Sequence, residues 1–186
     1  QLPVLGMAHL KMARGETTEA EKLIDAARNL KDDGAENVAP MLWKALFLFR
    51  RAAFGDALQW YRRALRAHPS APATVRLGIG ACQLRLGQFA EALKTYETGL
   101  ESDKRSIELH GNAAMAALKC EMFVQCIDHA TKACELAEFL LETPAHPTAI
   151  KCLQRRAAAR LQLSHYKDAL NDLSLAHRRD PGNAEV

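Results

Sequence analysis

The sequence predicts an all-α fold, a right-handed α-solenoid of about five stacked helix pairs. Two small residues seven positions apart recur along the chain, and successive first members are 37, 35, 34 and 43 residues apart. These spacings indicate a repeat of about 34 residues. Few β-branched residues and no alternating apolar runs argue against a sheet. The first members are Ala20, Ala57, Ala92, Cys126 and Ala169, and the second members are Ala27, Ala64, Gly99, Ala133 and Ala176.

Each unit should be a pair of antiparallel helices. Because one pair alone cannot bury its apolar face, the units should stack on one another. The expected first helices lie near residues 2–13, 38–51, 73–86, 107–120 and 148–163. The expected units of this single solenoid are about 1–37, 38–72, 73–106, 107–149 and 150–186. At the turn inside a unit, Gly15 and Gly87 supply a residue that tolerates left-handed geometry. Ala53, Glu121 and Ser164 stand at this turn in the other units. Pro69 and Pro181 are expected to end second helices.

The fourth unit contains extra residues, which we assign to a long linker at 138–148. The stretch ACELAEFLLE keeps the apolar spacing of a helix, so the second helix of this unit should continue through Leu141. Pro144 and Pro147 cannot continue it. We therefore expect the prolines to form an exposed connection to the last unit.

Aromatic residues stand at fixed places in this register. Four units carry one three residues before the first small residue, namely Phe54, Phe89, Phe123 and Tyr166, and Tyr61 and Tyr96 follow it by four. This pattern resembles the tetratricopeptide repeat. The resemblance implies a protein-interaction scaffold, in which the first helix of each unit lines a concave groove.

Composition and motifs exclude several classes of function. The five cysteines lack the paired spacing of zinc sites, and no phosphate-binding glycine loop or oriented nucleophile is recognisable. We therefore expect no enzyme, no catalytic residue, no metal and no cofactor. No apolar run approaches the roughly 18 residues of a membrane span. Unpaired thiols favour a nuclear or cytoplasmic location, and because the chain does not begin with Met, we expect a fragment of a longer protein.

Polar side chains of the last two groove helices form the candidate peptide-binding site: Asn112, Lys119, Lys151, Arg155 and Arg156. Asn112, Lys151 and Arg155 stand where co-chaperone tetratricopeptide domains carry three residues of their carboxylate clamp. Residues 107–186 resemble those domains and also an axonemal-dynein assembly factor. The resemblance implies capture of the acidic C-terminal peptide of a heat-shock chaperone. The clamp's lysine and asparagine of the preceding unit are replaced here by Leu77 and Ala81, and a solvated basic helix face is the alternative interpretation.

Residues 5–100 resemble a different protein, the repeat scaffold subunit of the RNA polymerase II-associated elongation complex. The run ALRAHPSAPATVRLGIGAC carries this resemblance, because its prolines and its VRLGIG segment lie outside the generic repeat pattern. The resemblance implies a structural scaffold that is wrapped by a segment of another subunit. Subunits of that complex are therefore the first expected class of partner, and chaperone C-terminal peptides are the second.

Charge is distributed unevenly along the first half, although the net charge is only +3. Seven acidic residues lie in 16–36, whereas 38–90 holds eight basic residues and a single acid, Asp56. Such a basic patch attracts acidic partners through a salt-sensitive field. Nucleic-acid binding is a third, less favoured alternative, because few aromatic residues are available to stack bases. The candidate patch consists of Arg50, Arg51, Arg62, Arg63, Arg66, Arg76 and Arg85.

Overall fold

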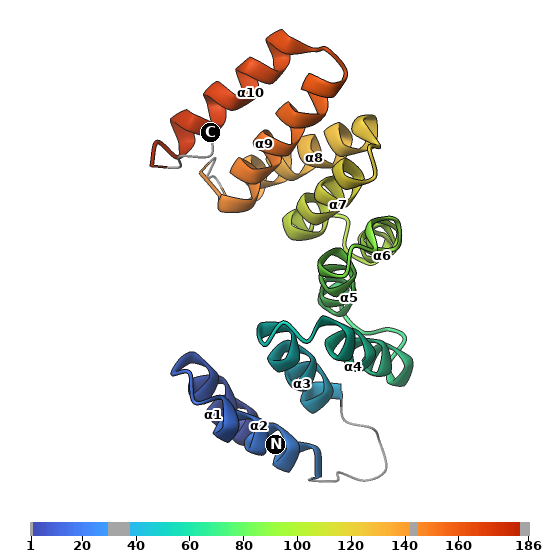
Figure 1. The fold of residues 1–186 in the computed structure, drawn as a ribbon, viewed down its shortest axis with the longest axis vertical. Coiled ribbons are helices and arrows are strands. Elements are labelled where there is room, and N and C mark those ends of the chain that lie inside the picture. Colours follow the sequence, from blue (N-terminus) through green and yellow to red (C-terminus); the bar gives the residue numbers. More distant parts are fainter. Residues whose placement is uncertain (1, 30–37, 142–144, 183–186) are drawn as a thin grey trace. The chain divides into compact units, whose positions relative to one another are not determined.

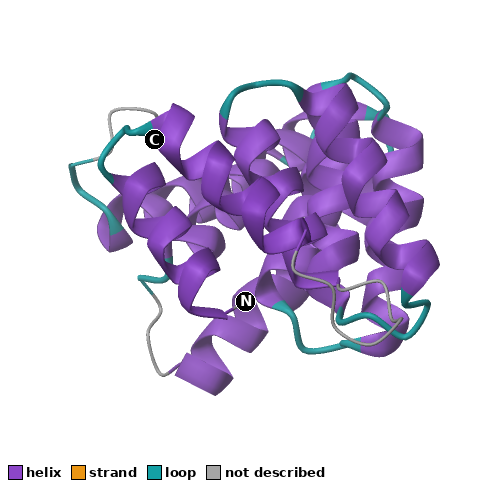
Figure 2. Ribbon diagram, turned by 90° about the horizontal axis from the view of Figure 1, so that it is seen from below, coloured by secondary structure: helices purple, strands orange, loops and turns teal. Residues whose placement is uncertain are grey.

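A computed structural model describes residues 2–29, 38–141 and 145–182, and all regular elements within these ranges are helices (Figures 1 and 2). The predicted all-α fold is therefore confirmed, and each first helix begins within one residue of its expected position. The ten helices of the described ranges are α1 (Leu2–Ala13), α2 (Thr17–Asn29), α3 (Val38–Arg50), α4 (Phe54–Ala67), α5 (Ala73–Arg85), α6 (Phe89–Ser102), α7 (Ile107–Lys119), α8 (Phe123–Leu141), α9 (Pro147–Gln162) and α10 (Tyr166–Arg179).

The chain divides into two compact units, Gln1–Leu86 with α1 to α5 and Gly87–Val186 with α6 to α10. We describe each unit by itself, and the arrangement of all repeats in one solenoid stays a prediction. Helix α8 ends at Leu141, as expected, and residues 142–144 of the predicted linker lie outside the described residues. Pro147 opens α9 at its first position, where a missing N–H costs nothing.

The small residues of the repeat occupy the closest helix contacts. All five first members are 0% exposed, and the second members are also buried. A larger side chain at these places would separate the two backbones, which explains the register that the sequence displays. Backbone turns follow the same register, because the residue five positions before each first member has a positive φ, between 59° and 78°.

One predicted turn residue is wrong. In the second unit the left-handed residue is Ala52, with φ 59°, and not Ala53, which caps α4 with φ −80°. The physical reason is that α3 ends at Arg50, so the chain must reverse one residue earlier for Ala53 to enter α4. Ala52 accepts the strained geometry although left-handed backbone costs a non-glycine residue about 1–2 kcal/mol.

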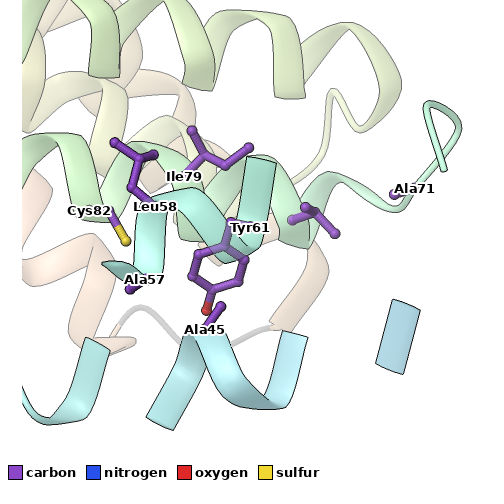
Figure 3. Close-up of a cluster of buried hydrophobic side chains, with 8 residues drawn as sticks. Ala45, Ala57, Leu58, Tyr61, Ala71, Ile79 and Cys82 are labelled. Atoms are coloured by element: carbon purple, nitrogen blue, oxygen red, sulfur yellow. The ribbon is translucent and has the colours of Figure 1, made fainter. Parts of the chain in front are cut away.

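The ring of Tyr61 lies at the centre of a buried cluster in the first unit (Figure 3). Leu58, Val75, Ile79 and Cys82 pack in the same cluster, which joins α3, α4 and α5. Helix α5 can approach the ring because it carries Gly78, where an added Cβ would lie 2.6 Å from the Tyr61 Cζ atom. A second cluster of Ala8, Ala20, Ile24 and Phe47 joins α1, α2 and α3.

Two histidines connect α7 and α8 in the second unit. The Nδ1 atoms of His110 and His129 are 3.2 Å apart, and the Nε2 atom of His110 lies 3.2 Å from the carbonyl oxygen of Lys104. The carbonyl can only accept, so Nε2 of neutral His110 carries the proton, and its Nδ1 accepts from the Nδ1–H of His129. Burial is the main cause that lowers the pKa of both imidazoles below 6.5. Folding therefore favours the neutral form of both rings.

Replacement of Gly78 by alanine should destabilise the protein. The new methyl group would overlap the Tyr61 ring, and relief of such overpacking costs about 1–3 kcal/mol in the free energy of unfolding. Gly6→Ala is the matched control, because no heavy atom lies within 4 Å of the added Cβ. That change should stabilise α1 by about 0.5–1 kcal/mol. Urea denaturation measures both, and equal stability of the two variants would contradict the packing.

The free energy of unfolding should fall as the pH drops below 6.5, the ordinary histidine value. The folded pKa values of His110 and His129 are lowered, so their contribution is fully present above 6.5 and is lost on protonation. A proton added to Nδ1 of His110 would lie opposite the Nδ1–H group of His129. Glu97, Asp103, Asp128 and Lys132 are the charged groups around the pair.

Urea denaturation at about pH 7.5 and about pH 5.5 checks this dependence. The double variant His110→Gln, His129→Gln should lose part of the pH dependence that the native chain shows. His68→Gln, at an exposed position in the first unit, is the control and should keep it. An unchanged slope in the double variant would refute the role of the pair.

Candidate functional site

An apolar hollow of about 260 Å³ opens between three helices of the first unit. Helices α3 and α5, the first helices of the second and third repeats, contribute most of its lining, and α4 contributes Tyr61. Trp43 of α3 is fixed in part by an edge contact with the ring of His9, whose centroid is 5.3 Å away. Such a hollow can receive an apolar side chain of a partner. Its lining is Ala39, Leu42, Trp43, Leu46, Tyr61, Thr74 and Val75.

The acidic and basic stretches of the first half meet where α2 packs on α3. The Nζ atom of Lys44 lies 2.9 Å from a Glu21 oxygen and 3.2 Å from Asp25. Arg51 lies 3.6 Å from Glu21 and 5.7 Å from the Phe47 ring centre. Part of the charge asymmetry in the sequence is therefore neutralised between neighbouring helices.

The seven arginines of the predicted basic patch all lie in the first unit, but their environments differ. Arg63 and Arg85 lie 5.5 Å and 4.9 Å from the ring centres of Trp60 and Phe54. Arg62 and Arg66 are exposed on α4, Arg50 is exposed at the end of α3, and Arg76 is half-buried on α5. The patch is therefore a set of arginines spread over three helices and the turn after α3, and no carboxylate is described beside Arg62 or Arg66.

All five predicted peptide-binding residues lie on α7 and α9, which pack on each other. Arg155 donates from Nη1 to the carbonyl oxygen of Gly111, at 2.6 Å, and so reaches the residue before Asn112. Lys151 is exposed one turn away on α9, and Asn112 is half-buried. Neither of these two side chains makes a hydrogen bond or ion pair within the described part of the chain. Lys119 is exposed at the last position of α7, two turns from Asn112.

Close packing at Gly111 holds this arrangement together. A Cβ at this position would lie 2.6 Å from the Thr148 Cγ2 atom and 3.4 Å from the Cys152 sulfur. Only a residue without a side chain therefore lets α9 approach α7 so closely. This approach allows the guanidinium of Arg155 to reach the α7 backbone.

The structure gives Arg156 a structural partner, which corrects its place in the predicted peptide site. Its Nε and Nη2 atoms bind the two carboxylate oxygens of Asp172 at 2.9 and 2.7 Å, and Nη1 donates to Thr131. Arg160 adds a third bond to the same carboxylate, at 2.6 Å. Asp172 is only 3% exposed, and a buried acid needs such partners. Arg156 thus joins α8, α9 and α10 and is not free for a ligand.

Four of the cysteines, Cys82, Cys126, Cys134 and Cys152, are buried, and none of the five forms a disulfide. Burial raises the pKa of Cys82 and Cys126 to about 11 and that of Cys152 to about 12. These thiols stay protonated at neutral pH and act as small apolar residues. Within the described ranges, no group of three His, Cys, Asp or Glu residues could hold a metal ion, and no helix is long and apolar enough to cross a membrane.

Curated relatives match about half of the chain. The identity is 36% over 104 residues with the Protein CTR9 homolog of Arabidopsis thaliana and 28% over 106 residues with the RNA polymerase-associated protein CTR9 of Caenorhabditis elegans. Each match covers 56% of this chain and 9% of the relative. Serine/threonine-protein phosphatase T of Aspergillus oryzae is 31% identical over 99 residues, which are 53% of this chain and 19% of the relative.

Solved structures share the fold at low identity. MamA of Desulfovibrio magneticus RS-1 aligns with a TM-score of 0.80 and 18% identity over 97% of this chain and 95% of its own. YrrB, a tetratricopeptide-repeat protein with an unusual peptide-binding site, aligns with a TM-score of 0.74 and 17% identity over 97% and 87%. Tetratricopeptide-repeat family profiles match residues 5–72 and 48–118. Together with the helix pairs and their buried small residues, these matches show that the chain belongs to the tetratricopeptide-repeat family.

Proposed function

We propose that the chain is a non-enzymatic scaffold that binds an extended segment of a partner protein along α3 and α5. The single observation that carries this proposal is the apolar hollow between these helices, with Trp43 and Tyr61 in its lining. Aromatic side chains in such hollows are frequent energetic centres of protein interfaces. The exposed arginines nearby in sequence favour a segment that also carries acidic residues.

The proposed context is the RNA polymerase II-associated elongation complex, and hence the nucleus. Its support is the resemblance of residues 5–100 to the scaffold subunit and the matches to two CTR9 proteins over about half of the chain. Because this chain spans only 9% of those relatives, the partner is proposed as a class, namely a subunit of such a complex.

The hollow can be tested at Thr74, an exposed residue in the first turn of α5 that contributes to its lining. Thr74→Glu places a charge at the hollow without unfolding α5, because an acid is tolerated near a helix N-terminus. We expect capture of RNA polymerase-associated subunits from nuclear extract by the tagged chain to fall by about tenfold or more, equivalent to about 1.4 kcal/mol. Quantitative mass spectrometry measures the loss.

Thr74→Val is the matched control, since it keeps the shape of the side chain and the apolar character of the hollow. It should capture the same subunits as the native chain. If circular dichroism shows an intact fold and the glutamate variant captures the subunits equally well, the hollow is not part of the interface. Absence of every such subunit from the native capture would refute the elongation-complex context.

A second candidate function is supported by a separate observation in the other unit. Asn112 and Lys151 lie near the Arg155–Gly111 contact without polar partners of their own in the described structure. An ammonium and a guanidinium close to an amide are suited to the paired carboxylates of an acidic C-terminus. We therefore propose a reduced carboxylate site of Asn112, Lys151 and Arg155, with Lys119 at its edge.

Calorimetry with an acidic C-terminal chaperone peptide at low salt tests this site. Lys151→Ala should weaken binding by about tenfold, because a hydrogen bond to a charged group contributes about 1.5–3 kcal/mol, and added salt should weaken native binding. Lys167→Ala, at an exposed position on α10, is the control. Arg155→Ala also removes the bond to Gly111, so its stability is measured alongside. Equal binding by Lys151→Ala would exclude the carboxylate site.

A further inference from the structure

The outer face of the first helix pair exposes large apolar side chains. Met7 and Leu10 of α1 are 49% and 59% exposed, and with the half-buried Leu23 of α2 they line an apolar hollow. Charged residues surround it: Lys11, Arg14, Glu19 and Lys22. In a stack of helix pairs, each pair buries its apolar face against a neighbour. This apolar face therefore needs an explanation.

The repeat register identifies the residues of the other repeats that are equivalent to Met7 and Leu10. Met7 and Leu10 stand 13 and 10 residues before the first small residue, Ala20. In the other four repeats the residues at these two positions are all buried or mostly buried, with at most 14% of a side chain exposed. The corresponding pairs are Lys44 and Phe47, Ile79 and Cys82, Ala113 and Ala116, and Arg156 and Ala159.

The preceding helix pair provides this burial. Phe47 packs with Ala20 and Ile24 of α2, and Ile79 and Cys82 pack with Leu58 and Tyr61 of α4. In the second unit, α6 packs on α7 and α8 packs on α9. In the other four repeats, the preceding helix covers the corresponding face. No described helix covers the outer face of α1 and α2.

Charge indicates the chemistry of a helix that would cover this face. Arg14 and Arg51 occupy the same repeat position, six residues before the first small residue, and Arg51 lies 3.6 Å from Glu21 of α2. Lys11 is already paired with Glu16 and Glu19, and the charge of Lys22 helps to lower the pKa of Glu19. Arg14 has no such acid within the described ranges. A neighbour with an acid at the position of Glu21 would supply the partner of Arg14.

We propose that this outer face binds an amphipathic helix of a partner protein, seated as α2 is seated on α3. Its apolar side chains cover Met7 and Leu10, and its acidic side chain faces Arg14. This interaction surface is separate from the hollow between α3 and α5. A second copy of the chain does not fit this role, because the exposed helix α10 carries Leu170 and Ser174 at the positions of Glu21 and Asp25.

The probe is a synthetic helix with the sequence of residues 17–29, which includes Glu21 and Ile24, and with Asp25→Leu. The leucine is introduced because Asp25 pairs with Lys44, and the first repeat has Met7 at that position. A covalent staple between positions 19 and 23 holds the peptide helical, since these positions lie opposite the binding stripe. Fluorescence polarisation measures its binding to the full 186-residue chain.

We expect saturable binding that Leu10→Glu weakens by at least about tenfold. Leu170→Glu, at another exposed leucine (65%), is the matched control and should leave the affinity unchanged. Arg14→Glu should also weaken binding, and a probe with Glu21→Arg should bind that variant more tightly than it binds the native chain. Both Leu10 and Arg14 are exposed, so the fold is retained, which circular dichroism checks.

Three results would overturn the proposal. The first is no saturable binding of the helical probe, and the second is equal affinity of the native chain and the Leu10→Glu variant. The third is self-association in sedimentation velocity that Leu10→Glu abolishes, because it would make a second copy the occupant. Tighter binding of the Glu21→Arg probe to the Arg14→Glu variant than to the native chain would support both the surface and the orientation of the helix.

Discussion

Close approach of helix backbones is the constraint on which the rest of the structure depends. The five first members of the repeat are four alanines and one cysteine, all fully buried. Two glycines allow the same close approach, Gly78 next to Tyr61 and Gly111 next to Thr148. Wherever a residue is this small, the neighbouring helix lies close enough for longer side chains to reach across. The bond from Arg155 to the α7 backbone and the cluster around Tyr61 both result from such contacts.

The two candidate sites differ in their chemistry because the facing helices differ. In the first unit, the helices around the hollow carry bulky apolar and aromatic residues, so a partner would gain mainly from burial of apolar surface. In the second unit, α7 and α9 contribute an amide, an ammonium and a guanidinium, so an acidic partner would gain from charge-assisted hydrogen bonds. One repeat family thus provides two kinds of surface within the same chain, and each can be examined without the other.

Most of the fold could be predicted from the sequence, because a short repeat fixes the register of each helix by local spacing. The starts of the first helices and the extension of α8 to Leu141 followed directly. The turn was assigned to Ala53 and lies at Ala52, because the two adjacent alanines cannot be distinguished by residue type. For the candidate sites, the sequence located charged helix faces but not their partners. The Asp172 carboxylate that engages Arg156 lies 16 residues away on another helix, and only three-dimensional packing reveals that pair.

The left-handed turn residues have a consequence for how this chain can vary. Three of the five turns place Ala52, Glu121 or Ser164 in a backbone region that glycine occupies more easily. Their geometry is therefore imposed by the docked helices and not by local preference. The information that defines a helix pair resides in its contact residues, and the turns here carry an alanine, a glutamate or a serine as well as glycine. Such turns are natural places to attach labels or to accept sequence drift without changing how the two helices meet.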